Sequence, residues 1–215
     1  MTKAEILKRV VDMRLGDGSY VDMSKYNDLV ARLEQDIRDE NNKKSGKANV
    51  ASLAKAIIKN GVHPMMKYAC TKNDIQYVLD GYRIAGFYNN LDLPEYNPDD
   101  FGGQNWYNVD RIIEGVEYDD EQPLTLPTKA ELESNIKIAK AKKRKDYFGS
   151  MWVFENGVKV DAQYLLDYIK AFPDMKVYSC VNKPKVNPVY IDSQYGMGIL
   201  LPINGEDKEP GFYTK

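Results

Sequence analysis

The sequence is poor in the residues from which most catalytic and metal centres are built. Its 215 residues include one histidine, His63, and two cysteines, Cys70 and Cys180. A zinc site needs three or four Cys and His ligands, and two cysteines make no disulfide framework. His63 lies in the loop-like Gly61–Pro64 segment, so we interpret it as a solvated side chain rather than as a catalytic base. These absences indicate a protein that is not an enzyme and holds no cofactor.

The sequence also lacks a long apolar run and a strong net charge. No stretch approaches the roughly 18 apolar residues that cross a bilayer. The Met1–Ile6 start lacks the apolar core of a signal peptide. We therefore expect a cytoplasmic protein that does not contact a membrane. The net charge of -2 excludes the global basic field that marks many nucleic-acid-binding proteins.

Helical periodicity dominates the first 40 residues. Two apolar faces at helical spacing are formed by Ile6, Val10, Val11 and Met13, and by Leu29, Val30, Leu33 and Ile37. We predict two helices between Thr2 and Glu40, separated at Gly16–Ser19. The polar stretch Asp39–Lys47 predicts a linker. Residues 1–46 therefore form a helical N-terminal extension and linker.

One order of predicted elements occurs twice in the rest of the chain. The first copy is a helix followed by three strands, at Val50–Gly61, Met66–Cys70, Ile75–Leu79 and Tyr82–Phe87. The second is a short strand, a helix capped by Asp161, a strand and a closing hairpin, at Val158–Val160, Ala162–Phe172, Lys176–Cys180, Pro188–Ile191 and Met197–Ile203. This order predicts an α+β domain of two pseudo-symmetric strand-helix-strands units. We assign it to residues 47–205, with a long insertion at 89–150 and a C-terminal tail at 206–215.

Three motifs in these units resemble the sliding clamp (beta subunit) of bacterial DNA polymerases. Tyr77–Ala85, YVLDGYRIA, is similar to the family's ATDGHRLA strand-turn-strand signature. Val160–Lys170 resembles its C-terminal helix entry, and Pro188–Ile191 with Ile199–Ile203 resembles its closing strands. The family's domain is itself a pseudo-symmetric pair of such units. The resemblance covers well under half of the chain, and a clamp ring needs six such domains where this chain has room for one.

The resemblance implies a non-enzymatic, processivity-factor-like protein that acts in or modulates DNA replication, encoded by a phage or a mobile element. Its expected partners are duplex DNA, replication proteins and further copies in a homo-oligomer. Clamps contact phosphates without reading sequence, through basic side chains on the helices that line the ring. The first helix offers Lys55 and Lys59, whereas the second offers Lys170 beside the carboxylates of Asp161 and Asp167. The alternative is a protein-interaction module on the same fold that binds no DNA.

A second basic element lies inside the insertion. Thr128, with Glu131 three residues later, predicts a capping box and a helix over Lys129–Lys145. Its cationic end supplies the remaining DNA-binding candidates, Lys137, Lys140, Lys142, Lys143, Arg144 and Lys145. A solvated helix end also explains this run, because the helix dipole favours cations there.

The segment from Asn89 to Thr128 has no counterpart in the clamp pattern. Its aromatic candidates for a partner-binding surface are Tyr96, Phe101, Trp106 and Tyr107. The other interpretation is that these rings fix the loop to the core. Its acidic residues are Asp99, Asp100, Asp110, Glu114, Glu117, Asp119, Asp120 and Glu121. Their spacing matches no metal motif, so we favour a hydrated loop over a metal-dependent nuclease site. Both cysteines are expected to be buried and inert.

Overall fold

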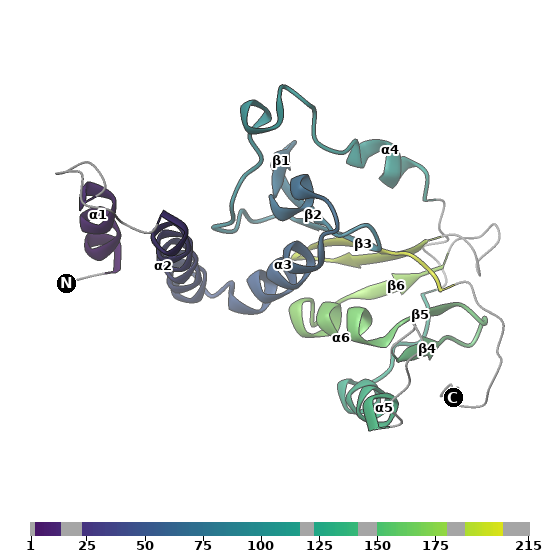
Figure 1. Cartoon of the computed structure of the whole chain (residues 1–215). Helices are drawn as coiled ribbons and strands as arrows, with labels where there is room; N and C mark the ends of the chain where they lie inside the picture. The colour runs from purple at the N-terminus through teal and green to yellow at the C-terminus, as the bar shows by residue number, and fades with distance from the viewer. Residues whose placement is uncertain (1–2, 14–22, 117–122, 142–149, 180–187, 204–215) are drawn as a thin grey trace.

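A six-stranded antiparallel sheet forms the centre of the computed structural model, which describes residues 3–13, 23–116, 123–141, 150–179 and 188–203 (Figure 1). The strand order is β1-β2-β3-β8-β7-β6. The strands are β1 (Cys70–Lys72), β2 (Ile75–Leu79), β3 (Arg83–Phe87), β6 (Lys176–Tyr178), β7 (Val189–Ser193) and β8 (Gly196–Leu200). Because β3 pairs with β8, two meanders from distant parts of the chain join in the middle of one sheet. The α+β class predicted from the sequence is confirmed.

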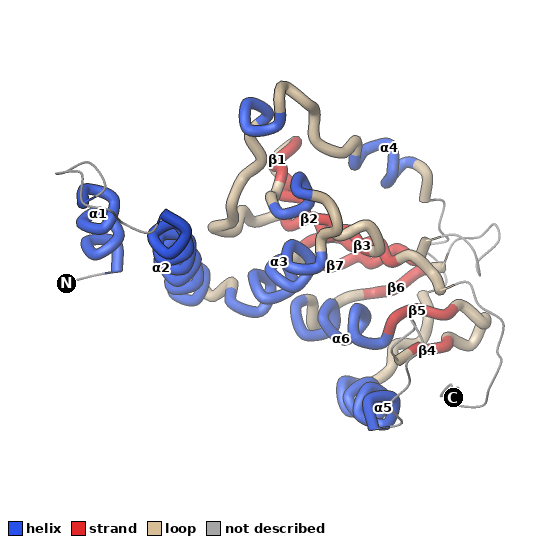
Figure 2. Tube along the Cα trace, viewed as in Figure 1, coloured by secondary structure: helices blue, strands red, loops and turns tan. Residues whose placement is uncertain are grey.

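Two helices lie side by side on one face of this sheet (Figures 1 and 2), namely α3 (Ala48–Asn60) and α6 (Ala162–Ala171). Both are amphipathic, with apolar side chains three and four residues apart, so each presents one stripe to the sheet. The main core is formed by Leu53, Ala54 and Ile57 of α3, by Leu165, Leu166 and Tyr168 of α6, and by Val78, Ala85, Val177 and Ile191 of the strands. Gly198 of β8 makes room for the Tyr168 ring, since a Cβ at Gly198 would lie 2.5 Å from Cε1 of that ring.

Local capping signals begin two of the helices as the sequence predicts. The Asp161 carboxylate accepts hydrogen bonds from the backbone N–H groups of Gln163 (2.7 Å) and Tyr164 (3.0 Å), which caps α6. The capping box of α5 (Lys129–Ala141) is also present. The Thr128 N–H donates to Glu131 at 2.7 Å, and the Glu131 N–H donates to the Thr128 hydroxyl at 3.2 Å.

The opposite face of the sheet is covered by the insertion that follows β3. This segment carries a short helix η2 (Pro98–Phe101) and α4 (Val109–Glu114), and it packs near η1 (Pro64–Lys67). A second, smaller core forms there from Met66, Tyr77, Leu79, Ile84, Trp106, Val109, Val116, Met197 and Ile199. The Trp106 side chain anchors this layer, because it is 9% exposed and its Nε1–H donates to the Met65 carbonyl at 3.1 Å.

The remaining described elements belong to the segment that precedes α6 and to the N-terminal segment that precedes α3. The two-stranded sheet of β4 (Met151–Val153) and β5 (Lys159–Asp161) leads into α6, and α5 packs against α6. At the N-terminus, α1 (Lys3–Met13) and α2 (Met23–Lys44) pack on each other, and α2 leads into α3 (Figure 1). In the described parts of the chain, no helix has both the length and the apolar character that a membrane span requires.

The linker predicted at Asp39–Lys47 is wrong for most of its length. Helix α2 continues to Lys44, and a turn at Gly46, with φ of 75°, leads directly into α3. The reason is a tertiary contact. The buried Asn42 amide donates to the Asp92 carbonyl and accepts from the Asp92 N–H, both at 3.1 Å. A polar helix end is thereby docked on the insertion, which the local sequence does not reveal.

The strand predicted at Met66–Cys70 is also displaced. Residues Pro64–Lys67 form η1, and the strand begins only at Cys70. Pro64 has the fixed φ that suits the first position of such a turn, and the Trp106 indole holds the Met65 carbonyl. Cys70 is only half-buried, which corrects the expectation of a core residue, while Cys180 lies outside the described residues.

Trp106→Ala should release the insertion from the sheet. We expect a loss of roughly 3–5 kcal/mol in the free energy of unfolding, because the change removes a buried ring and its hydrogen bond. Urea denaturation followed by circular dichroism measures the loss. Ile112→Ala on the neighbouring α4, where the side chain is 39% exposed, is the control and should cost less than about 1 kcal/mol. Equal losses in the two variants would contradict the anchoring role.

Candidate nucleic-acid interface

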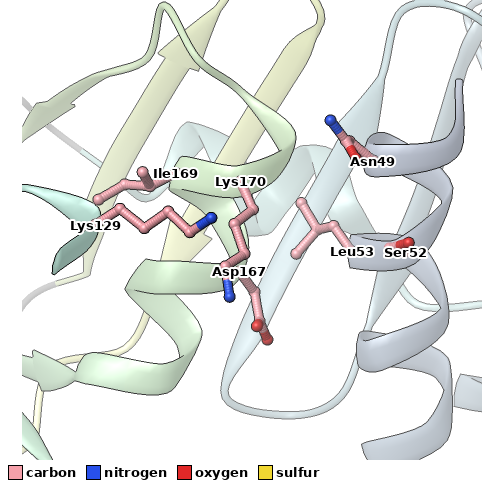
Figure 3. A pocket seen from close by; sticks show the side chains of 7 residues that line it. All are labelled: Asn49, Ser52, Leu53, Lys129, Asp167, Ile169 and Lys170. Carbon is pink, nitrogen blue, oxygen red and sulfur yellow. The ribbon is translucent and has the colours of Figure 1, made fainter. Parts of the chain in front are cut away.

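The outer surface of the paired helices carries a pocket of about 470 Å³ between α3, α6 and the start of α5 (Figure 3). Asn49, Ser52 and Leu53 project into it from α3, opposite Asp167 and Lys170 of α6. Lys129, the first residue of α5, reaches in from the other side of α6. The wall therefore combines amide, hydroxyl and ammonium groups and one carboxylate with the apolar side chains of Leu53 and Ile169. Its two ammonium groups, of Lys129 and Lys170, are of the kind that contacts a backbone phosphate.

The Asp167 carboxylate is held by a buried arginine. The Arg83 side chain has no exposed surface, and its Nη1 lies 2.8 Å from Oδ2 of Asp167. Its Nε lies 2.9 Å from Oδ2 of Asp80, which also accepts, through Oδ1, the N–H groups of Tyr82 and Arg83. The guanidinium carbon lies 4.1 Å from the centre of the Tyr164 ring. This ion-pair network joins the turn between β2 and β3 to the middle of α6.

The network keeps arginine charged although it is buried. Burial opposes the charge, but the hydrogen bond to Asp167 and the charge of Asp80 outweigh it, so that the pKa of Arg83 lies above its ordinary value. Burial raises the pKa of Asp161, and this rise is limited by the N–H groups of Tyr164 and Gln163 that its carboxylate accepts. Both carboxylates that weaken the cationic character of α6 in sequence are thus occupied by internal contacts.

The lysines on this side of the molecule fall into two groups. Lys55 of α3 forms an ion pair with Asp39, and Lys170 of α6 lies 3.3 Å from Glu133 of α5. Lys59 of α3, and Lys137 and Lys140 of α5, are exposed. Helix α6 lies between α3 and α5 (Figure 1), so the helices that carry these exposed lysines lie on both sides of it.

Four of the predicted DNA-binding residues cannot be placed, since Lys142, Lys143, Arg144 and Lys145 lie outside the described residues. The structure describes the predicted helix from Lys129 to Ala141.

The aromatic candidates form two pairs within the insertion. Tyr96 stacks on Phe101 with ring centres 5.1 Å apart, and Phe101 meets Tyr68 edge-on at 5.6 Å. Trp106 meets Tyr107 edge-on at 5.6 Å. The Trp106 ring belongs to the second core, whereas the rings of Tyr96, Phe101 and Tyr107 keep part of their surface exposed. A partner surface at these three rings stays a prediction, and Trp106 serves packing.

The acidic residues of the insertion do not gather into a metal site in the part of the chain that the structure describes. Asp99 and Asp100 lie in η2, and Asp110 pairs with Lys72. Glu117, Asp119, Asp120 and Glu121 lie outside the described residues. His63 is exposed, as predicted. Burial and the nearby Glu95 raise the pKa of the Cys70 thiol, which disfavours the thiolate that a nucleophile needs.

The sequence patterns did not reveal the network around Arg83. One signal was present, because an arginine in the otherwise apolar run Arg83–Phe87 follows an aspartate by three residues. The partner at Asp167 could not be found in this way, since it lies 84 residues further along the chain. Comparison with protein-family models, with curated proteins and with solved structures finds no match.

Arg83→Ala should destabilise the fold strongly, because it leaves two carboxylates without their partner. Breaking a buried ion pair by removing one member costs about 3–5 kcal/mol. Urea denaturation gives the change in unfolding free energy. Lys170→Ala, which breaks the exposed pair with Glu133, is the control and should cost less than about 1 kcal/mol. A loss in Arg83→Ala as small as that of the control would show that the network contributes little.

Proposed function

We propose that this protein is a non-enzymatic, clamp-like module of DNA replication that holds duplex DNA on the outer surface of α3, α5 and α6. The observation that supports this proposal best is the arrangement of helices and strands. Each of α3 and α6 is followed by three antiparallel strands. The two helices lie together on one face of the sheet, and the pairing of β3 with β8 joins the two sets of strands into that sheet. This is the arrangement expected of two pseudo-symmetric units in a clamp-like domain.

The details of the two units favour a repeat. Leu53, Ala54 and Ile57 of α3 correspond to Leu165, Leu166 and Ile169 of α6, and most of these side chains pack in the same core. Both helices are followed by a proline before the next strand, Pro64 and Pro173. Their strands then run in opposite order, β1-β2-β3 and β8-β7-β6, across the sheet. A two-fold axis between β3 and β8 would relate them.

The chemistry of the helix surface suits loose, sequence-independent contact. Ammonium groups of Lys59, Lys137 and Lys140 are exposed there, and such groups bind phosphate as point charges. Asp161 and Asp167, which would repel phosphates, are held by internal contacts. The amide of Asn49 supplies a neutral donor between the helices, while the hydroxyl of Ser52 donates within α3 to the Ala48 carbonyl at 2.8 Å. No contact of this kind distinguishes one base from another.

The second candidate function is a protein-interaction module on the same fold. The ion pairs support it. Lys55 of α3 and Lys170 of α6 are already paired with Asp39 and Glu133. The net charge of -2 also provides no general attraction to DNA. Under this alternative the partly exposed rings of Tyr96, Phe101 and Tyr107 are the expected contact surface.

The two functions differ in how DNA binding responds to salt and to charge reversal. We expect the wild-type protein to bind a labelled duplex, with an affinity that falls steeply between about 50 and 200 mM salt. Reversing three charges in Lys59→Glu, Lys137→Glu and Lys140→Glu should weaken binding at least about tenfold. The salt slope should fall by about 0.9 for each phosphate that the variant no longer neutralises. Fluorescence anisotropy titrations measure both quantities.

The matched control reverses three exposed charges elsewhere, in Lys43→Glu, Lys44→Glu and Lys176→Glu. Lys43 and Lys44 end α2, and Lys176 alternates with Val177, which faces the helices, so its side chain points from the other face of the sheet. Both triple variants change the net charge equally. Equal weakening in the two, or no binding by the wild-type protein at the lowest salt, would rule out the DNA proposal and leave the interaction module.

A further inference from the structure

The central sheet has two edges, β1 and β6, and both could accept another strand. An uncovered edge strand presents N–H and C=O groups to which a second chain can add. Because the two edges here are different strands, addition of one copy's β1 to another copy's β6 would be head-to-tail. Head-to-tail contacts produce rings or filaments. The chain nevertheless places hydrogen-bond partners of its own against both edges.

The β1 edge is covered by residues 91–96 of the insertion, which we term the strap. The Ala69 N–H donates to the Pro94 carbonyl at 2.8 Å, and the Tyr96 N–H donates to the Ala69 carbonyl at 2.7 Å. These bonds form a parallel bridge between Ala69 and Glu95. Backbone groups alternate in direction along a strand, so those of Thr71 point to the same side as those of Ala69. The strap therefore lies beside Ala69, on the side of β1 where the strand of a second chain would have to pair.

Side chains fix the strap to the sheet. Glu95 accepts a hydrogen bond from the Thr71 hydroxyl at 2.9 Å and another from the Gln76 amide. The Gln76 side chain, 2% exposed, also accepts the Leu91 N–H at 2.9 Å. Leu91 and Leu93 are buried in the main core. A second copy could reach β1 only after these polar and apolar contacts had broken.

The β6 edge is covered by Leu124, which lies between α4 and α5 in the same insertion. The Leu124 N–H donates to the Val177 carbonyl at 2.7 Å, and the neighbouring Thr125 N–H donates to Glu155 at 2.9 Å. Of the three residues of β6, Val177 is the one whose carbonyl points away from β7. With that carbonyl occupied and Leu124 buried, β6 offers no continuous row of groups to a second chain.

We propose that the strap and Leu124 act as edge guards, which keep this chain from assembling sheet to sheet with its own copies. The two guards lie in one insertion, so a single segment protects both edges. The inference does not rest on DNA binding, because it concerns the sheet edges and not the helix surface. It makes the single chain, rather than a ring of copies joined through their sheets, the unit that acts.

Two substitutions, one for each guard, remove contacts that hold it on the sheet edge, and each has a matched control. Glu95→Ala removes the acceptor for Thr71 and Gln76, whereas Glu95→Gln keeps an oxygen acceptor at that position. Leu124→Pro removes the N–H that binds Val177, whereas Leu124→Ala shortens the side chain but keeps that N–H. Circular dichroism and a cooperative thermal transition check that each variant folds.

Sedimentation velocity over the micromolar range gives the assembly state. We expect the wild-type chain and both controls to sediment as monomers of 24.6 kDa. Each single release frees one edge, which can pair only with the same edge of another copy, so we expect dimers. The double variant Glu95→Ala, Leu124→Pro frees two different edges and should form species larger than dimers.

Two results would overturn the proposal. One is a wild-type chain that associates through its sheet edges, and the other is a folded double variant that stays monomeric throughout. If the double variant does not fold, hydrogen exchange on the wild-type chain decides. The amides of Tyr96 and Leu124 should then be protected like those of the neighbouring strands. Exchange as fast as in an unbonded loop would exclude a guarding role.

Discussion

The ion-pair network around Arg83 is the constraint on which the arrangement of this domain depends. A charged guanidinium is buried between the turn that joins β2 to β3 and the middle of α6, with Asp80 on one side and Asp167 on the other. A hydrophobic contact of similar area would tolerate a helix that slides or rotates, but a charge without its partner is costly. The network therefore fixes where α6 lies on the sheet. One half of that sheet, β1 to β3, precedes α6 in the sequence, and the other half, β6 to β8, follows it. Nη2 of Arg83 has no hydrogen-bond partner among the described residues, and the facing Tyr164 ring offsets part of that cost.

The same network changes the electrostatic character of the helix surface. Asp167 lines the pocket between the helices, and Arg83 offsets part of its charge, although Arg83 also pairs with Asp80. Asp161 is used to cap α6. A surface that is mixed in sequence is therefore less repulsive to phosphate than its composition suggests. The pairing of Lys55 and Lys170 with Asp39 and Glu133 acts in the opposite direction, which is why the exposed lysines beside α6 carry the proposal.

The insertion between the two sets of strands has two structural roles. Trp106, Val109 and Val116 cover the second face of the sheet, which would otherwise expose Tyr77, Ile84 and Ile199. Two parts of it, the strap and Leu124, cover the sheet edges. Without such a cover, a single domain with a large sheet would expose one face and two strand edges at once. The proposed clamp-like function and the edge guards are compatible, since the first uses the helix surface and the second the sheet.

The sequence by itself determined the features that depend on neighbouring residues. The strand Ile75–Leu79, the Asp161 cap and the capping box at Thr128 were predicted correctly, because alternation and capping act within a few residues. The tertiary structure alone decided the rest. It extended α2 through Asn42, placed Trp106 in a core, paired Arg83 with Asp167 and laid Glu95 against the β1 edge. These contacts join residues 24 to 84 positions apart, and no local pattern specifies which distant group will meet a given side chain. The low content of histidine and cysteine could be read from the composition, whereas the partner of each charged side chain depended on folding.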